Sequence, residues 1–163
     1  NDRSSLRAIL EYSFIFPTKV RGEIDQFSMV TFRNYDYEYR FHVNRVLVIS
    51  RLGLYRLQKL IPYVVAGIGM AIHDVGSYQE FPKPNIMSRF TPGFISATKR
   101  NFTYTFGAGL RFIISKNINL SIVYRFDCYG DIQTGVGVNT FAGDKIGHKI
   151  YANNVILHFI YLI

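Results

Sequence analysis

The chain has 163 residues, with 19 Lys and Arg against 11 Asp and Glu, which gives a formal net charge of +8. Apolar residues make up 48% and aromatic residues 16%, so the chain is too apolar to be disordered and fits one domain. The single cysteine, Cys128, excludes an internal disulfide framework and a cysteine-rich zinc module. The longest apolar stretch, residues 60–72, contains Pro62 and two glycines, which excludes a membrane-spanning helix of ~20 apolar residues.

The first predicted strand covers residues 6–14. Apolar side chains occupy its even-numbered positions, and the opposite face is mixed, because successive side chains of a strand point to opposite sides. The even positions hold Leu6, Ala8, Leu10, Tyr12 and Phe14, and the odd positions hold Arg7, Ile9, Glu11 and Ser13.

Residues 35–56 contain two alternating runs of opposite parity. Apolar residues occupy the odd positions in 35–43 but mainly the even positions in 45–56. A β-bulge near Asn44 would switch the parity within one long strand, and a separate short strand is the alternative. We favour the single long strand, rising above a membrane.

Four further strands are predicted, over residues 63–73, 102–114, 118–128 and 151–163. Every even position of 102–114 and 118–128 is apolar, which chance would produce in roughly 1 of 10,000 registers at an apolar frequency near one half. No segment shows a convincing helical period. The sequence therefore predicts an all-β fold of about six strands.

The connections alternate strictly between short and long. Residues 58–61 and 115–117 are predicted as tight turns, and residues 15–34, 74–100 and 131–149 as long loops. An antiparallel up-and-down meander gives this order, and short turns at one end with long loops at the other are typical of outer-membrane barrels.

The composition of the two strand faces favours a transmembrane barrel over a soluble sandwich. The apolar face is rich in Phe and Tyr, and the opposite face holds Gly, Thr, Ser, Asn, Arg and Asp. A water-facing side should be rich in Lys and Glu, yet residues 102–114 contain no lysine. Gly67, Gly69, Gly107 and Gly109 lie on the small face, where a narrow closed barrel crowds its side chains.

Three motifs resemble the opacity-type, outer membrane protein A-like family of small outer-membrane β-barrels. PYVVAGIG at residues 62–69 is similar to the family's PYVGAGIG strand. FGAGLRF at 106–112 and NLSIVYRF at 119–126 resemble its GAGLxF and NLSLxxGYRY hairpin. Phe159, Tyr161 and Ile163 alternate as in the C-terminal strand read by barrel-assembly machinery, although the family usually ends in Phe.

This resemblance implies an antiparallel, eight-stranded barrel in the bacterial outer membrane. With six strands in the given sequence, we expect one N-terminal hairpin and a signal peptide to lie outside this chain. The alternative is that residues 27–43 supply the missing pair.

Parity assigns the candidate functional residues to two faces. An inward charge network is expected, and it reads more readily as a structural plug than as a basic pore. Its members are Arg7, Glu11, Arg45, Arg51, Arg111, Arg125 and Asp127. The expected lipid-facing residues are Phe102, Tyr104, Phe106, Phe112, Tyr124 and Phe126.

Basic residues in the predicted loops suggest contact with anionic surfaces. They are Lys83, Arg89, Lys99, Arg100, Lys145, His148 and Lys149. Lipopolysaccharide phosphates are the simplest partner, and the resemblance adds adhesion to host glycans or receptors. Nucleic acid is not expected, because no recognition motif accompanies the scattered charges.

Catalysis has little support in the sequence. Asp74 could orient His73 toward a nucleophilic Ser77, as in a lipid A-modifying barrel. His42 and His158 show no metal-ligand spacing, and no cofactor is expected. We therefore expect a non-enzymatic barrel with a structural and surface-contact role. A small porin and a lipid A-modifying enzyme are the alternatives.

Overall fold

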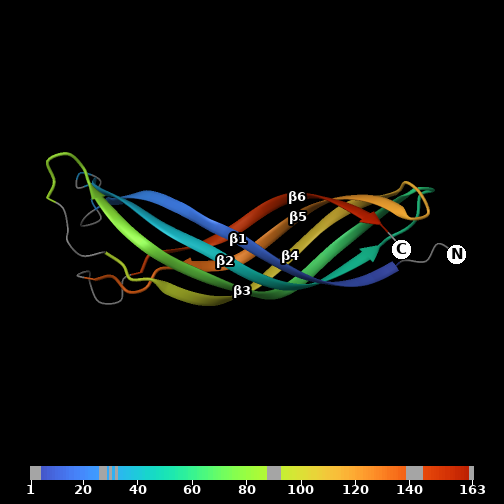
Figure 1. Cartoon of the computed structure of the whole chain (residues 1–163), viewed down its shortest axis with the longest axis horizontal. Coiled ribbons are helices and arrows are strands. Elements are labelled where there is room, and N and C mark those ends of the chain that lie inside the picture. Colours follow the sequence, from blue (N-terminus) through green and yellow to red (C-terminus); the bar gives the residue numbers. More distant parts are fainter. Residues whose placement is uncertain are drawn as a thin grey trace.

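The computed structural model describes residues 5–25, 29, 31, 33–87, 93–138 and 145–161. Over these residues the chain is all-β, as predicted, and each strand pairs antiparallel with the next in a single up-and-down sheet. The strands are β1 (Ser5–Asp25), β2 (Arg33–Gly53), β3 (Leu60–Pro82), β4 (Ala97–Ile113), β5 (Ile118–Gln133) and β6 (Gly147–Tyr161). Figure 1 shows that they curl into an elongated half-barrel. Among the described residues, no helix is long and apolar enough to cross a membrane.

Short and long connections lie at opposite ends of the sheet (Figure 1). At the end that carries both termini, β2 joins β3 and β4 joins β5 through short turns. In the β2–β3 turn, Gln58 has a positive φ of 52°. In the β4–β5 turn, the Ser115 hydroxyl accepts hydrogen bonds from the backbone N–H groups of Asn117 and Ile118. We call this the short-turn end, and the opposite end the long-loop end.

The strands are longer than the sequence predicted, at the expense of the loops. Much of the predicted loop 15–34 is strand, because β1 continues to Asp25 and β2 begins at Arg33. In the same way, β3 continues to Pro82 and β4 begins at Ala97. Near the long-loop end the apolar side chains lie on the other face of the sheet, so a search for one constant apolar face ended each strand too early.

Strand β2 runs from Arg33 to Gly53 without a change of parity. The predicted bulge near Asn44 is wrong, because Asn44 pairs regularly with Phe14 and Ile72. The prediction of one long strand holds, and residues 33–43 are part of it rather than an extra pair. What changes near Asn44 is which face is apolar, since odd-numbered side chains point inward along the whole strand.

Three bulges occur in the odd-numbered strands, and a further register shift lies in β2 between Arg33 and Tyr35, at the start of that strand. One lies in β1 between Ile15 and Thr18, and one lies in β3 opposite Tyr39, where Ser77 has φ 54°. A third follows Cys128 in β5, where Gly130 has φ 88°. Because a bulge bends its strand and increases the local twist, these three sites help the sheet to curl.

Two apolar clusters fill the inner face at different heights. The upper cluster, toward the long-loop end, comprises Tyr39, Phe41, Val43, Ala71, Val75, Tyr78, Tyr129 and Ile132. The lower cluster comprises Leu47, Ile49, Tyr63, Val65 and Val123. Charged side chains lie between the two clusters and again below the lower one, so the inner face alternates in polarity along the length of the half-barrel.

Candidate functional site

The outer face of the lower half carries an exposed apolar surface, which we call the outer band. It includes Leu10, Val48, Ile68, Phe106 and Val155, whose exposed fractions run from 55% to 76%. Of the residues predicted to be outward-facing, Phe102, Tyr104, Phe106, Phe112 and Tyr124 are exposed, and Phe126 is half-buried among neighbouring rings. Large apolar side chains therefore cover the outside of the half-barrel while polar groups are enclosed within it.

Charged residues replace the apolar ones on the outer face above this band. The Glu38 carboxylate contacts Lys19 Nζ and Arg21 Nε, each at 2.9 Å. Hydrogen bonds from Lys19 and then Arg21 lower the pKa of Glu38 from its ordinary value. In this upper part the sheet follows the rule of a soluble protein, with charges outside and the upper apolar cluster inside.

A polar pocket lies just above the outer band, with a volume of about 480 Å³. His42 Nε2 lies 3.0 Å from one Asp74 oxygen, and the Thr98 hydroxyl donates to the other at 2.5 Å. Arg40 and Ser77 also line the pocket. Sequence reasoning had set His42 aside, and only its position opposite Asp74 across β2 and β3 reveals the pair.

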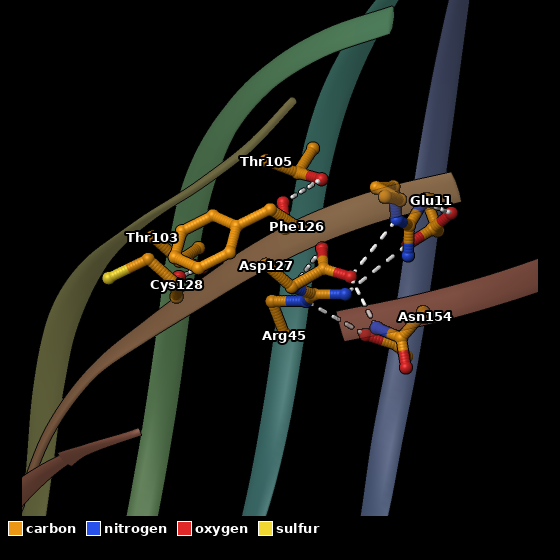
Figure 2. A network of polar contacts seen from close by, with 10 residues as sticks. Glu11, Arg45, Thr103, Thr105, Phe126, Asp127, Cys128 and Asn154 are labelled. Carbon is orange, nitrogen blue, oxygen red and sulfur yellow. Dashed lines mark hydrogen bonds and ion pairs between the residues drawn. The ribbon is translucent and has the colours of Figure 1, made fainter. Parts of the chain in front are cut away.

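Four of the seven predicted inward charges form one buried network (Figure 2). Asp127 is fully buried and accepts hydrogen bonds from Arg45 Nη1 at 2.9 Å and from Arg125 Nε at 3.1 Å. Arg125 also donates to both Glu11 oxygens, at 2.7 and 3.0 Å, and Asn154 donates to Asp127 at 2.6 Å. The network joins β1, β2, β5 and β6 across the concave face.

Side chains that carry no charge complete this network. Ser13 Oγ accepts a hydrogen bond from Arg45 Nε at 3.0 Å, and the Arg45 guanidinium lies 4.1 Å from the Tyr129 ring centroid. Buried charges are costly unless all their donors and acceptors have hydrogen-bond partners. Ser13 supplies an acceptor and Asn154 a donor for the positions that the ion pairs do not fill. Sequence reasoning missed both, although Ser13 lies at the inward parity of β1.

The other three predicted inward charges lie apart from that network, nearer the short-turn end. Arg51 and Arg111 are buried, and Arg7 is exposed on the edge strand β1, opposite Arg51. Within the described part of the chain, none of the three has an ion pair to a carboxylate. The seven predicted residues therefore divide, within the described chain, into a group joined by ion pairs and a group without them.

The predicted anion-contact residues lie partly on strands rather than loops. Lys99 and Arg100 belong to β4, and His148 and Lys149 belong to β6. Two of the lysines already have partners, because Lys83 Nζ lies 2.7 Å from Glu23 and Lys99 Nζ lies 3.8 Å from Asp131. Arg100, Lys145, His148 and Lys149 are exposed, and Arg89 lies outside the described residues.

The arrangement proposed for catalysis is not formed. His73 is fully buried on the inner face, and its Nε2 lies 2.7 Å from the Tyr129 carbonyl oxygen. Asp74 points to the opposite face, where it pairs with His42, so it does not orient His73 toward Ser77. The described residues also contain no group of three His, Cys, Asp or Glu side chains placed to hold a metal.

At the C-terminal end, Phe159 and Tyr161 are exposed on the outer face of β6 with the predicted alternation. Ile163, the last residue of the predicted assembly signal, lies outside the described residues. Cys128 is a free, buried thiol.

Comparison with known proteins found no matching family model, curated protein or solved structure.

Proposed function

We propose that this chain is an integral β-barrel protein of a bacterial outer membrane, with a structural and surface-contact role and no catalytic activity. The observation that carries the proposal is the inversion of polarity along each strand. Apolar side chains cover the outside of the lower half, which encloses the charge network and the lower apolar cluster. Charged side chains cover the outside of the upper half, which encloses the upper apolar cluster. If water surrounded both halves, the outer band would have no explanation, because soluble monomers rarely expose so continuous an apolar surface.

The dimensions of the outer band support the proposal. Its alternating apolar residues run over 6–14 in β1, over 64–72 in β3 and, with Ser50 as the polar exception, over 46–54, which ends one residue beyond β2. A tilted strand needs ~9–11 residues to cross the hydrocarbon layer, which matches these runs. Above them, Arg40, His42 and Arg100 face outward at the height where lipid headgroups would lie.

Spin labels at two outward-facing positions test the placement of the band. Cysteine is introduced at Ile68, within the band, or at Arg40, above it, in a Cys128→Ser background. In vesicles, we expect oxygen to relax the label at position 68 more strongly than a water-soluble nickel chelate does, with the reverse order at position 40. Equal access of the nickel chelate to both labels would overturn the membrane placement.

A conducting pore would give a different result in the same vesicles. The upper cluster and the Arg45–Asp127 pair fill the described interior with buried side chains, which supports a plug. We therefore expect no conductance steps from reconstituted protein, and regular steps would favour the porin alternative.

Surface contact is assigned to the charged outer face above the band and to the long-loop end. Arg40, Arg100 and Lys149 have no ion pair among the described residues, so their charges are available to phosphate groups. Binding to vesicles that contain lipopolysaccharide tests this part. We expect Arg40→Gln with Arg100→Gln to weaken binding and to make it less sensitive to salt, and the spin-label result to stay unchanged.

A further inference from the structure

The inner face holds an arginine cluster whose hydrogen-bonding capacity is not used within the described chain. We define this lower arginine cluster as Arg7, Arg51 and Arg111. Arg111 is 5% exposed, and its Nε and Nη2 atoms are buried with no hydrogen-bond partner among the described residues. Arg51 is 6% exposed, and its Nε is likewise buried with no partner in that part of the chain. A guanidinium group withdrawn from water without a partner is costly, so these donors need an acceptor.

The three arginines belong to one neighbourhood. Arg7 lies directly opposite Arg51 in the β1–β2 ladder, and the charges of Arg7 and Arg51 are the ones that repel Arg111. The carboxylates of this half of the interior are already committed: Glu11 and Asp127 bind Arg45 and Arg125. The cluster is therefore an excess of positive charge on the inner face.

The interactions that Arg51 makes leave N–H donors at the edge of its guanidinium group available for a ligand. Its guanidinium group lies over the Tyr63 ring, 4.5 Å from the centroid, a contact that uses the flat face of the group. Its Nη2 lies 3.3 Å from His158 Nδ1. Arg51 and His158 border a cavity of about 300 Å³ that Glu11 and Arg125 also line. Arg7 and Arg111 are not part of its lining, so this cavity gives room on one side of Arg51 only.

We propose that the lower arginine cluster binds an oxyanion, a phosphate or a carboxylate group, between Arg51 and Arg111, with Arg7 completing the site from the edge strand. Guanidinium groups suit this chemistry because their planar N–H donors match the paired oxygens of such anions. The site lies on the inner face and therefore does not depend on what covers the outer face.

Titration of the folded full chain in detergent with inorganic phosphate, against chloride at equal ionic strength, tests the site. We expect saturable heat of binding and a rise in the unfolding midpoint with phosphate. Arg111→Gln should weaken phosphate binding at least tenfold and Arg111→Lys less. Arg56→Gln, at an exposed arginine that follows β2 at the short-turn end, should leave binding unchanged and serves as the matched control.

Two further variants keep the test decisive. Arg7→Gln alters an exposed member and should weaken binding without loss of folding, even if Arg111→Gln misfolds. Asp2→Asn tests whether the chain's own carboxylate five residues before Arg7 is the oxyanion, and tighter phosphate binding by this variant would assign the anion to that source. Absence of saturable phosphate binding by both the wild type and Asp2→Asn would overturn the proposal, as would equal binding by Arg7→Gln, Arg111→Gln and the wild type.

Discussion

Arg45 Nη1 donates to Asp127 Oδ1 at 2.9 Å, although 82 positions separate the two residues in the sequence. Arg45 is 1% exposed and Asp127 is 0% exposed, so neither side chain has bulk water to replace its partner. The pair joins β2 to β5 across the concave face and holds together strands that are not neighbours in the sheet. Substitution of either residue would therefore leave the other with a buried charge that has lost this partner.

Asp127→Ala should lower the free energy of unfolding by about 3–5 kcal/mol, because it leaves the guanidinium groups of Arg45 and Arg125 without a shared acceptor. Urea unfolding in detergent measures the loss. The control is Asp131→Asn, at a half-exposed carboxylate near the long-loop end, which should cost less than about 1 kcal/mol. Adding Arg45→Met to Asp127→Ala should restore part of the stability, and strictly additive losses would show that the pair is not coupled.

Gly69→Ala should destabilise the sheet by about 1–3 kcal/mol, because a methyl group there would overlap the Val46 carbonyl oxygen, which belongs to rigid backbone. Gly76→Ala is the matched control on the same strand, since its methyl group would meet only the Ser96 side chain, at 3.1 Å. Unfolding midpoints of the two variants measure the difference. Equal midpoints would mean that β2 and β3 can separate slightly without cost.

The proposed membrane placement predicts that Ile68→Arg costs about 2–4 kcal/mol in a lipid bilayer and Ile72→Arg about 0–1 kcal/mol, because a charge is most expensive at the bilayer centre. Ile68 lies between Val48 and Tyr104, while Ile72 lies between Asn44 and Arg100 at the upper border of the outer band. Reversible unfolding from vesicles provides the measurement. Similar costs at the two positions would contradict a depth-dependent environment.

Burial raises the pKa of Tyr39 to about 12. Because this value lies above the ordinary pKa of about 10, the folded state favours the neutral phenol. The stabilisation is therefore fully present below pH ~10 and is lost as the pH rises from ~10 through ~12. The difference in phenolate absorbance between the wild type and Tyr39→Phe should titrate near pH 12, and a titration near pH 10 would contradict burial of this side chain.

The sequence allowed the strand number, the strand order and the two faces of the lower half to be predicted. These properties follow from period-two alternation, which is a local signal. The upper half was misread, because Tyr39 and Phe41 are apolar residues of the inner face there, whereas Val46 and Val48 are apolar residues of the outer face. Alternation reports that two faces differ, but it does not report which of them meets the solvent.

The site was predicted only in part, for a similar reason. Parity placed Glu11, Arg45, Arg125 and Asp127 on one face, but the pairing between them depends on how tightly the sheet curls. Curling brings Glu11 of β1 to Arg125 of β5, and no carboxylate of the described residues pairs with Arg51 or Arg111. The His42–Asp74 pair was missed because the two residues are neighbours only across a ladder, a relationship that single-strand patterns do not contain.

Odd-numbered side chains of β2 point inward along the strand, so its two faces depend more on the number of residues in the strand than on their identity. Deleting one residue between Tyr39 and Val43 would rotate everything on one side of the deletion by half a turn. Arg45 and Arg51 would then point outward, and Val46 and Val48 would point inward. The loss of one codon would therefore exchange the inner and outer faces of the strand, which a single substitution does not do.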